Sequence, residues 1–561
     1  MTLAALCRRG VRWASIACLS LAAAAISPVA ARDTQPQVRV RQGILRGVDA
    51  GSHVIAYKGI PYARPPVGGL RWRPPVPAPG WKGVRDAKAF GSACLQPPAD
   101  PKGLYSSGMA ATSEDCLSLN VWAPAGARKL PVMVWIHGGA LVGGSSSEAL
   151  YDGAKLARHG IVFVSINYRL GLLGYLAHPA LSAESTQHLS GNYGLLDQIE
   201  ALRWVHDNIA AFGGDPAQVT IAGESAGGLS VIALLASPQA RGLFGKAITQ
   251  SGYMPSYRTL HEASRGLPSA EDGGAALARS AGLSTAAELR AADLAILFKA
   301  GLATGWQPEP VIDGVVLKRQ FAETFARGEQ ARVPVLAGFN EGEIRSLLFL
   351  MPPGVPDSQA AYVADVRRRF GGEAAGFLSV YPGADPRADV MASVRDAIYG
   401  WAAQNVARQQ AALGQPAYLY FFRHSTPAER ARDLAAFHAS ELPYIFGQVG
   451  ADGALGANWP RPPLNQTEAR LSDAMMRYWV SFVKSGEPTA PGEVAWPRYT
   501  TERHDYLDIG DSPVAKRDLL PEAFALADAL VSRRMREGKS WRLDTGFSAF
   551  PAAPQGAGGR R

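Results

Sequence analysis

The sequence predicts an α/β protein whose mostly parallel central sheet carries helices on both faces. Apolar, β-branched runs alternate with helical patterns through most of the 561 residues. These runs lack a polar face, which is typical of parallel strands buried on both sides. The composition, 47% hydrophobic and 19% charged, is that of a globular protein. It excludes a disordered, collagen-like or multi-span membrane chain.

The expected elements follow one another as strand, helix, strand. Five runs are predicted to be buried strands: 131–136, 161–166, 219–222, 333–337 and 417–422. Between the second and third, apolar residues recur at helical spacing from Leu196 to Phe212, and Gly213 ends that helix. A second helical run, 229–236, follows the third strand. This alternation indicates one doubly wound sheet with a single core.

We expect residues 32–548 to form one domain. Ala- and Arg-rich stretches near 255–310 and 345–415 are expected to be helical insertions that cap one edge of the sheet. The Pro-, Gly- and Ala-rich segment 549–561 is predicted to be a disordered tail.

The first 31 residues have the pattern of a secretory signal peptide. Arg8, Arg9 and Arg12 precede a short apolar core at 16–26, and small residues end at Ala31, the expected cleavage position. The core is shorter than the roughly 20 apolar residues of a membrane span, and no other stretch approaches that length. We therefore expect a secreted or periplasmic protein without an integral membrane span; an uncleaved N-terminal anchor is the alternative.

Charge and cysteine content narrow the possible partners and cofactors. The formal net charge is +9, but the lysines and arginines form no basic run, so we expect no nucleic-acid partner. Signal cleavage leaves Cys94 and Cys116, 22 residues apart, which we expect to pair in an exported protein. Two free thiols are the alternative. No metal-ligand spacing occurs, so we expect no metal and no cofactor.

A nucleophilic serine is predicted at Ser225. Gly223-Glu224-Ser225-Ala226-Gly227 fits the pattern G-x-S-x-G, and it lies between a predicted strand and a predicted helix. Such a tight turn raises the serine hydroxyl above the sheet, and its glycines leave room for neighbouring backbone. The helix N-terminus favours negative charge nearby.

An oxyanion hole is predicted from two segments. Ala226 supplies one backbone N–H by its position after the nucleophile. Gly139 and Ala140, directly after the strand 131–136, are expected to supply the others. We interpret His137, in the same loop, as a histidine that braces the loop and not as the catalytic base.

On an α/β-hydrolase scaffold the catalytic acid and then the histidine follow the serine in the chain. His438 is the predicted base because its loop follows the last long strand; His424 and His504 are the alternatives. The segment after strand 333–337 offers Glu341 and Glu343 as the acid, and position alone does not separate them.

These motifs resemble the type-B carboxylesterase family, whose members are cholinesterase-like and have the α/β-hydrolase fold. The similarity covers roughly residues 35–545. Besides the serine turn, it rests on the blocks 58–63, 70–75, 114–120, 191–198, 212–216, 250–252 and 310–314.

The resemblance implies a role for each of several residues. It makes Ser225 the nucleophile, Glu343 the acid, in preference to Glu341, and His438 the base. It implies oxyanion donors at Gly139, Ala140 and Ala226, and a Cys94–Cys116 disulfide. It further implies that Glu224 lies beside the triad and that Ser251 hydrogen-bonds the acid.

The sequence therefore predicts a cofactor-free serine hydrolase that cleaves small-molecule carboxylic esters through an acyl-enzyme. Amide or lactone hydrolysis by the same triad is one alternative, and a non-catalytic binding module on the same scaffold is another. The sequence does not indicate the physiological ester or the oligomeric state. The positive net charge and Arg345, close to the predicted acid, favour an anionic ester.

Overall fold

The computed structural model describes residues 35–98, 100–106, 111–352, 354–450 and 452–541. The predicted signal peptide and the predicted tail at 549–561 lie outside the described residues. Residue contacts separate Met1–Gln35 from Pro36–Arg561, and all helices and strands described below belong to this second unit.

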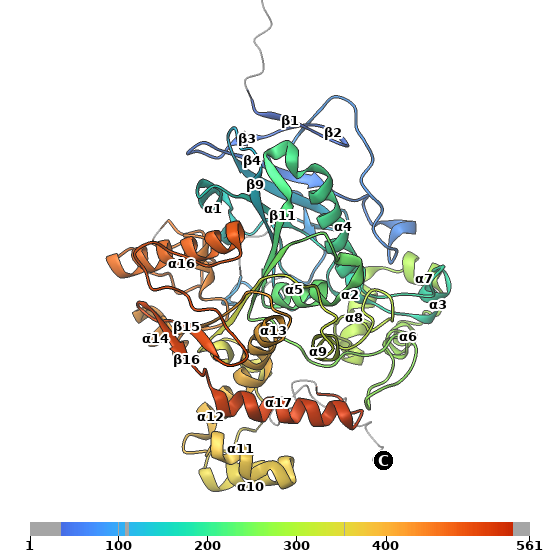
Figure 1. The fold of residues 1–561 in the computed structure, drawn as a ribbon. Helices are drawn as coiled ribbons and strands as arrows, with labels where there is room; N and C mark the ends of the chain where they lie inside the picture. The colour runs from blue at the N-terminus through green and yellow to red at the C-terminus, as the bar shows by residue number, and fades with distance from the viewer. Residues whose placement is uncertain (1–34, 99, 107–110, 353, 451, 542–561) are drawn as a thin grey trace, which may run out of the picture. The chain divides into compact units, whose positions relative to one another are not determined.

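An eleven-stranded sheet forms the centre of this unit (Figure 1). Its strands, in spatial order, are β16 (Pro513–Arg517), β15 (Asp505–Ile509), β14 (Ala417–Phe422), β13 (Val335–Asn340), β12 (Lys246–Gln250), β11 (Gly214–Glu224), β9 (Leu130–Ile136), β10 (Val162–Ile166), β8 (Ser118–Pro124), β4 (Val54–Pro61) and β3 (Val48–Asp49). The strands from β15 to β10 pair in parallel, and those at both ends pair antiparallel. The predicted mostly parallel sheet and its five predicted strands, β9, β10, β11, β13 and β14, are confirmed. The other six strands, β3, β4, β8, β12, β15 and β16, were not predicted.

Two small sheets accompany the large one. One contains β1 (Gln37–Val40), β2 (Gly43–Arg46) and β5 (Val84–Asp86), and the other pairs β6 (Ala93–Cys94) with β7 (Thr112–Ser113).

The α-helices are α1 (Ala154–Arg158), α2 (Gly171–Tyr175), α3 (Pro179–Ala183), α4 (Tyr193–Asn208), α5 (Ala226–Ala236), α6 (Ala270–Ser280), α7 (Ala286–Ala291), α8 (Leu294–Thr304), α9 (Phe321–Ala326), α10 (Gln359–Phe370), α11 (Ala374–Val380), α12 (Pro386–Arg395), α13 (Trp401–Ala412), α14 (Pro427–Ala431), α15 (Leu442–Ile445), α16 (Gln466–Ser485) and α17 (Pro521–Arg536). Within the described ranges, none of the helices is both long enough and apolar enough to span a bilayer.

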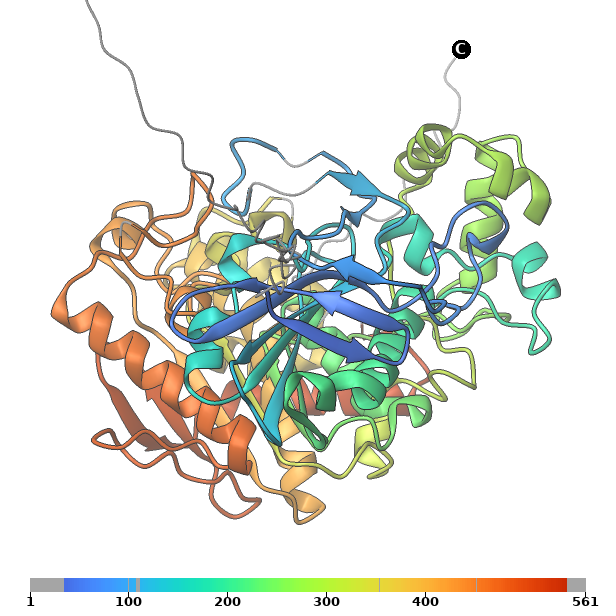
Figure 2. The same ribbon diagram turned by 90° about the horizontal axis from the view of Figure 1, so that it is seen from above.

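Strand β9 shows why helices cover both faces of the sheet. Its side chains alternate in direction, so Val132 and Val134 belong to the core on the side of α4 and α5. Met133 and Trp135 belong to the core on the side of α1 and α16. Figures 1 and 2 show α4 and α16 on opposite sides of the central strands. Because helices cover both faces of the sheet, we look for a ligand-binding site at the carboxyl ends of its parallel strands.

The stretches predicted as cap insertions are helical in the structure. The first contains α6, α7 and α8, and the second contains α10 to α13. Helix α13 packs directly against β13 and β14, whereas α10 packs against α11. That these stretches act as a cap remains a prediction.

Candidate active site

Loops that follow four parallel strands, β9, β11, β13 and β14, meet at one edge of the sheet. They surround a cavity of about 610 Å³. Ser225, Gly139, Ala140 and His438 line this cavity, and Glu343 lies behind His438, fully buried. The structure therefore brings together residues that lie up to about three hundred positions apart in the sequence.

Ser225 lies at a sharp turn between β11 and α5. Its backbone has φ 57° and ψ −120°, a conformation that non-glycine residues rarely adopt. The glycine two residues later is required by space, because a Cβ on Gly227 would lie 2.0 Å from the carbonyl oxygen of Ile136. The side chain of Ser225 is half-buried, so its hydroxyl is open to the cavity.

The residues of the predicted oxyanion hole lie in two segments next to Ser225: Ala226 follows it directly, and Gly139 and Ala140 line the same cavity. Ala226 is the first residue of α5, and the first N–H groups of a helix have no partner within it. Gly139 and Ala140 are exposed and line the cavity, with φ 101° and 54°. A Cβ on Gly139 would lie 2.2 Å from the carbonyl oxygen of Gly143, so the loop closes tightly on itself there.

His438 and Glu343 form a buried pair. The Nδ1 atom of His438 contacts Oε2 of Glu343. The other carboxylate oxygen of Glu343 accepts hydrogen bonds from Ser251 Oγ at 2.7 Å and from the backbone N–H of Asn340 at 2.8 Å. Three donors thus hold one carboxylate, which fixes the imidazole. Glu341, the alternative acid, is half-buried, and its carboxylate does not reach His438 in the described contacts.

Glu224 faces the other side of the same imidazole. Its Oε1 atom lies 3.1 Å from Nε2 of His438. Burial raises the pKa of Glu224 to about 8, although His438 opposes this shift. Burial lowers the pKa of His438, but the charges of Glu224 and Glu343 outweigh that effect and raise it to about 9. While these two carboxylates are ionised, the imidazole therefore holds its proton more tightly than a free imidazole does.

A further buried carboxylate, Glu441, lies beneath this pair and was missed in the sequence. It accepts hydrogen bonds from Gln250 Nε2 at 2.8 Å and from Asn340 Nδ2 at 2.6 Å. Asn340 Nδ2 also donates to the carbonyl oxygen of Phe437, next to His438. The only sequence signal was position, three residues after His438 and within the same loop.

His137 lies in the loop of Gly139 and is buried. Its ring stacks on Tyr168 with 4.5 Å between ring centroids, and Nδ1 is 2.9 Å from the carbonyl oxygen of Gly138. Burial lowers the pKa of His137 to about 4, so the ring is neutral. These contacts fit the predicted bracing role.

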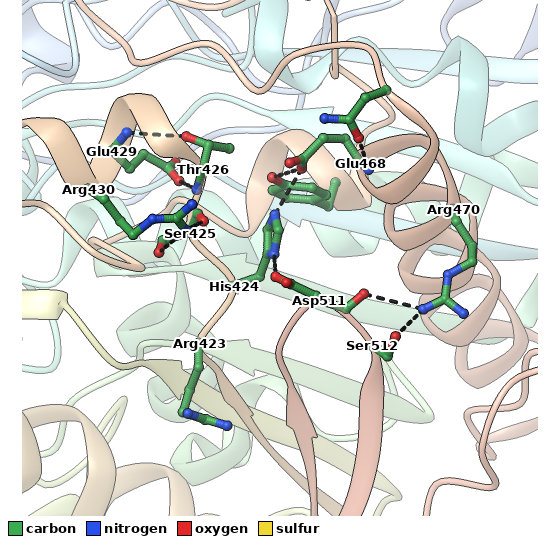
Figure 3. Close-up of polar contacts among 12 residues, drawn as sticks. Arg423, His424, Ser425, Thr426, Glu429, Arg430, Glu468, Arg470, Asp511 and Ser512 are labelled. Atoms are coloured by element: carbon green, nitrogen blue, oxygen red, sulfur yellow. Dashed lines mark hydrogen bonds and ion pairs between the residues drawn. The ribbon is translucent and has the colours of Figure 1, made fainter.

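His424 lies in a separate polar cluster, shown in Figure 3. Its Nδ1 is 2.7 Å from Asp511 Oδ1 and its Nε2 is 2.9 Å from Glu468 Oε2. Both ring nitrogens are occupied, and His424 does not line the cavity. His504 is partly exposed, stacks on Tyr499 and lies 3.3 Å from Asp518. Neither alternative base reaches Ser225.

Cys94 and Cys116 form a disulfide in the structure. Much of the cavity wall is aromatic, and none of the aromatic residues in it was predicted from a motif: Tyr105, Tyr151, Tyr253, Tyr257, Phe349, Tyr399 and Trp459. Arg345 is not among the lining residues and pairs with Asp433 instead. Because the described lining contains no lysine or arginine, the structure gives no support to a preference for anionic esters.

A strained serine turn, an imidazole–carboxylate pair and this strand order define an α/β-hydrolase. The model of the carboxylesterase family matches residues 34–372 and 381–526. The chain is 37% identical over 482 residues to fumonisin B1 esterase of Sphingopyxis macrogoltabida, covering 84% of this chain and 86% of that protein. It is 35% identical over 501 residues to para-nitrobenzyl esterase of Bacillus subtilis, covering 86% and 97%.

Among solved structures, a PNB esterase superposes with a TM-score of 0.74 at 33% sequence identity. The match covers 87% of this chain and 99% of the other. The chain therefore belongs to the carboxylesterase family, and it is an enzyme that hydrolyses carboxylic esters. The predicted family, fold and reaction class are confirmed.

Proposed function

We propose that this enzyme cleaves esters with a Ser225–His438–Glu343 triad and an oxyanion hole made of the N–H groups of Gly139, Ala140 and Ala226. The observation that carries the proposal is the contact of His438 Nδ1 with Glu343, while the same histidine lines the cavity of Ser225. Glu343 holds the ring through Nδ1, which leaves Nε2 to exchange the proton of Ser225, and it stabilises the charged form of the ring that develops during reaction.

The reaction takes place in two halves. Neutral His438 accepts the proton of Ser225 as the hydroxyl oxygen attacks the ester carbonyl carbon. The tetrahedral intermediate collapses, its alcohol leaves with the proton from His438, and an acyl-enzyme remains on Ser225. Water, deprotonated by His438, then attacks the acyl carbon. The bond from that carbon to Ser225 Oγ breaks, His438 returns the proton to Oγ, and the carboxylic acid is released. In both halves the three N–H groups stabilise the oxyanion, each contributing on the order of 10²–10³ in rate.

Two substitutions in the same loop test the triad with a matched control. Glu343→Gln removes the charge that stabilises the imidazolium, and we expect kcat for a p-nitrophenyl ester to fall by about 10³ or more. Glu341→Gln changes the same chemical group two residues away and should leave kcat within about twofold of wild type. Equal effects of the two variants would contradict the assignment of the acid.

Ser225→Ala tests the nucleophile itself. We expect nearly all p-nitrophenyl ester turnover to be lost, because no acyl-enzyme forms without the hydroxyl. Residual activity above roughly a tenth of wild type would mean that another residue is the nucleophile.

The substrate is a small-molecule ester, and the aromatic wall and the lining residues Leu141, Val142 and Leu350 favour an apolar acyl or alcohol group. A panel should contain short-acyl, long-acyl and bulky-alcohol esters. Fumonisin B1 and p-nitrobenzyl esters belong in it because two relatives are named for them. Matched amides and lactones test the alternative reactions of the same triad.

We also propose that the enzyme is exported and loses residues 1–31. The Cys94–Cys116 disulfide supports an oxidising compartment. The intact mass of protein recovered outside the cytoplasm tests this, since a mature N-terminus at Arg32 is expected. Retention of the first 31 residues would favour the N-terminal anchor.

A further inference from the structure

The segment closed by the Cys94–Cys116 disulfide touches both halves of the proposed catalytic machinery. The structure describes its residues 94–98, 100–106 and 111–116. We propose that this segment is a positioning element, in which Gln96 fixes the oxyanion loop, residues 139–144, and Tyr105 fixes the loop of the base, residues 436–444. The inference rests on the proposed function and assigns these two residues a part in it.

Gln96 is bonded to the oxyanion loop through both ends of its amide. Its Oε1 accepts a hydrogen bond from the N–H of Gly144 at 2.9 Å, and its Nε2 donates to the carbonyl oxygen of Gly144, also at 2.9 Å. Nε2 also donates to the carbonyl oxygen of Cys94 at 2.9 Å, which joins the amide to the disulfide. The side chain is buried.

The bond to Gly144 fixes the donors because the oxyanion loop is closed on itself. The N–H groups of Val142 and Gly143 both donate to the carbonyl oxygen of Gly139, each at 2.9 Å. These internal bonds tie Gly139 to residues directly before Gly144, so a restraint on Gly144 also restrains the backbone of Gly139. Gln96 therefore attaches the segment that carries the N–H groups of Gly139 and Ala140, in addition to β9 and to the N–H of Gly171, which donates to the carbonyl oxygen of Leu141 at 2.7 Å.

Tyr105 joins the loops of the acid and the base. Its hydroxyl lies 2.9 Å from the carbonyl oxygen of His438 and 2.7 Å from Oγ of Ser346. A phenol has one proton, so it donates to the carbonyl and accepts from the serine. Ser346 directly follows the short 3₁₀ turn Glu343–Arg345. One hydroxyl thus bridges the turn of the acid and the backbone of the base.

The ring of Tyr105 is fixed as well. It packs edge-on against Trp459 at 5.7 Å and lies 6.4 Å from the ring of His438. Asn458 Nδ2 donates to the carbonyl oxygens of Pro101 and Gly103, which anchors the backbone just before Tyr105. The segment is therefore held by the disulfide at its ends and by Asn458 near its middle.

This arrangement matters because the oxyanion donors and the base come from loops on different strands. The distance between these loops decides whether the oxyanion donors and the base can both act on the same reacting group. A displacement of about 1 Å can lower the rate of reaction strongly. A covalently closed segment that bonds to both loops holds them at a fixed separation. Neither Gln96 nor Tyr105 needs to touch the reacting atoms for this purpose.

The test compares two variants with matched controls, and all rates are expressed per active site titrated with a fluorophosphonate. Tyr105→Phe and Gln96→Met remove the bonds to His438 and Gly144. We expect each to lower kcat and kcat/KM equally, by about 3- to 10-fold, with KM unchanged. The controls are Tyr506→Phe in β15 and Gln410→Met in α13, which line no part of the cavity. The kcat of both controls, expressed per titrated active site, should equal that of wild type.

Titration separates positioning from mere loss of folded protein. A purely structural role would reduce the number of titratable sites and leave the rate per site intact, and that result would overturn the proposal. Failure of wild-type enzyme to react stoichiometrically with the fluorophosphonate would instead overturn the proposed function, and this inference with it.

Reduction of the disulfide provides an independent measurement. In wild type, mild reductant should lower kcat per titrated site toward that of the Tyr105→Phe/Gln96→Met double variant. In the double variant, reduction should have little further effect, because the two bonds that transmit it are gone. Equal fold-losses in wild type and double variant would show that the segment does not act through these residues.

Discussion

Glu224→Gln should move the pH dependence of catalysis toward lower pH. His438 must be neutral to accept the proton of Ser225, so kcat/KM for an uncharged ester rises as the imidazole loses its proton. Glu224 Oε1 is 3.1 Å from the Nε2 atom that carries this proton. The substitution keeps the shape of the side chain and removes its charge.

The size of the shift follows from that distance. An opposite charge within about 4–6 Å favours a charged group by about 1–3 pKa units. Burial lowers the pKa of His438, and Glu224 leads the carboxylates that raise it to about 9. Without Glu224, we expect the pKa on the acidic limb of the profile to fall by about 1–3 units. The maximal kcat/KM at high pH should also fall, because the carboxylate of Glu224 stabilises the imidazolium in the transition state.

The assay is kcat/KM for p-nitrophenyl acetate between pH 5 and 10, read at the isosbestic wavelength of the product. Glu341→Gln is the control, since its carboxylate lies outside the contacts of His438 and its profile should overlie wild type. An unchanged or raised pKa in Glu224→Gln would refute the reasoning. It would show that the carboxylate beside Ser225 does not control the base.

Two further predictions concern the turn and the pH dependence of stability. Gly227→Ala places a Cβ 2.0 Å from the carbonyl oxygen of Ile136, so we expect the variant to lose activity and to have a clearly lower Tm. The control is Gly69→Ala, whose Cβ meets nothing within 4 Å and whose activity and Tm should match wild type. Burial raises the pKa of Glu429 to about 7, so the folded protein binds this proton more tightly and stability falls as pH rises from about 4.5 to 7. Glu429→Gln should therefore lose less Tm than wild type between pH 5 and 8; equal losses would contradict the assignment.

The sequence was sufficient for five of the eleven strands of the central sheet and for singling out Ser225 and His438, which line one cavity in the structure. Strong apolar runs mark buried strands, and the serine turn needs glycines that leave a visible pattern. Strand β12 was missed because Lys246–Gln250 is short and has polar residues at three of its five positions, although all five are buried. Packing between neighbouring strands makes this segment a strand although its own sequence pattern for a strand is weak.

Chain position alone did not separate the two candidate acids, and the cavity wall could not be predicted at all. The family resemblance favoured Glu343 over Glu341, and in the structure it is Glu343, at the start of the 3₁₀ turn Glu343–Arg345, that contacts His438. Tyr105 and Trp459 come from loops without regular periodicity, so no pattern placed them beside the site. Arg345 lies two residues after Glu343 in the sequence, yet its side chain does not line the cavity.

The most direct test of the central claim is the mass-spectrometric location of a fluorophosphonate adduct on the native enzyme. We predict one adduct per chain, on the peptide that contains Ser225, formed slowly in His438→Ala and absent in Ser225→Ala. A stoichiometric adduct on any other residue, or an unchanged rate of labelling in His438→Ala, would contradict the claim that this imidazole activates this serine.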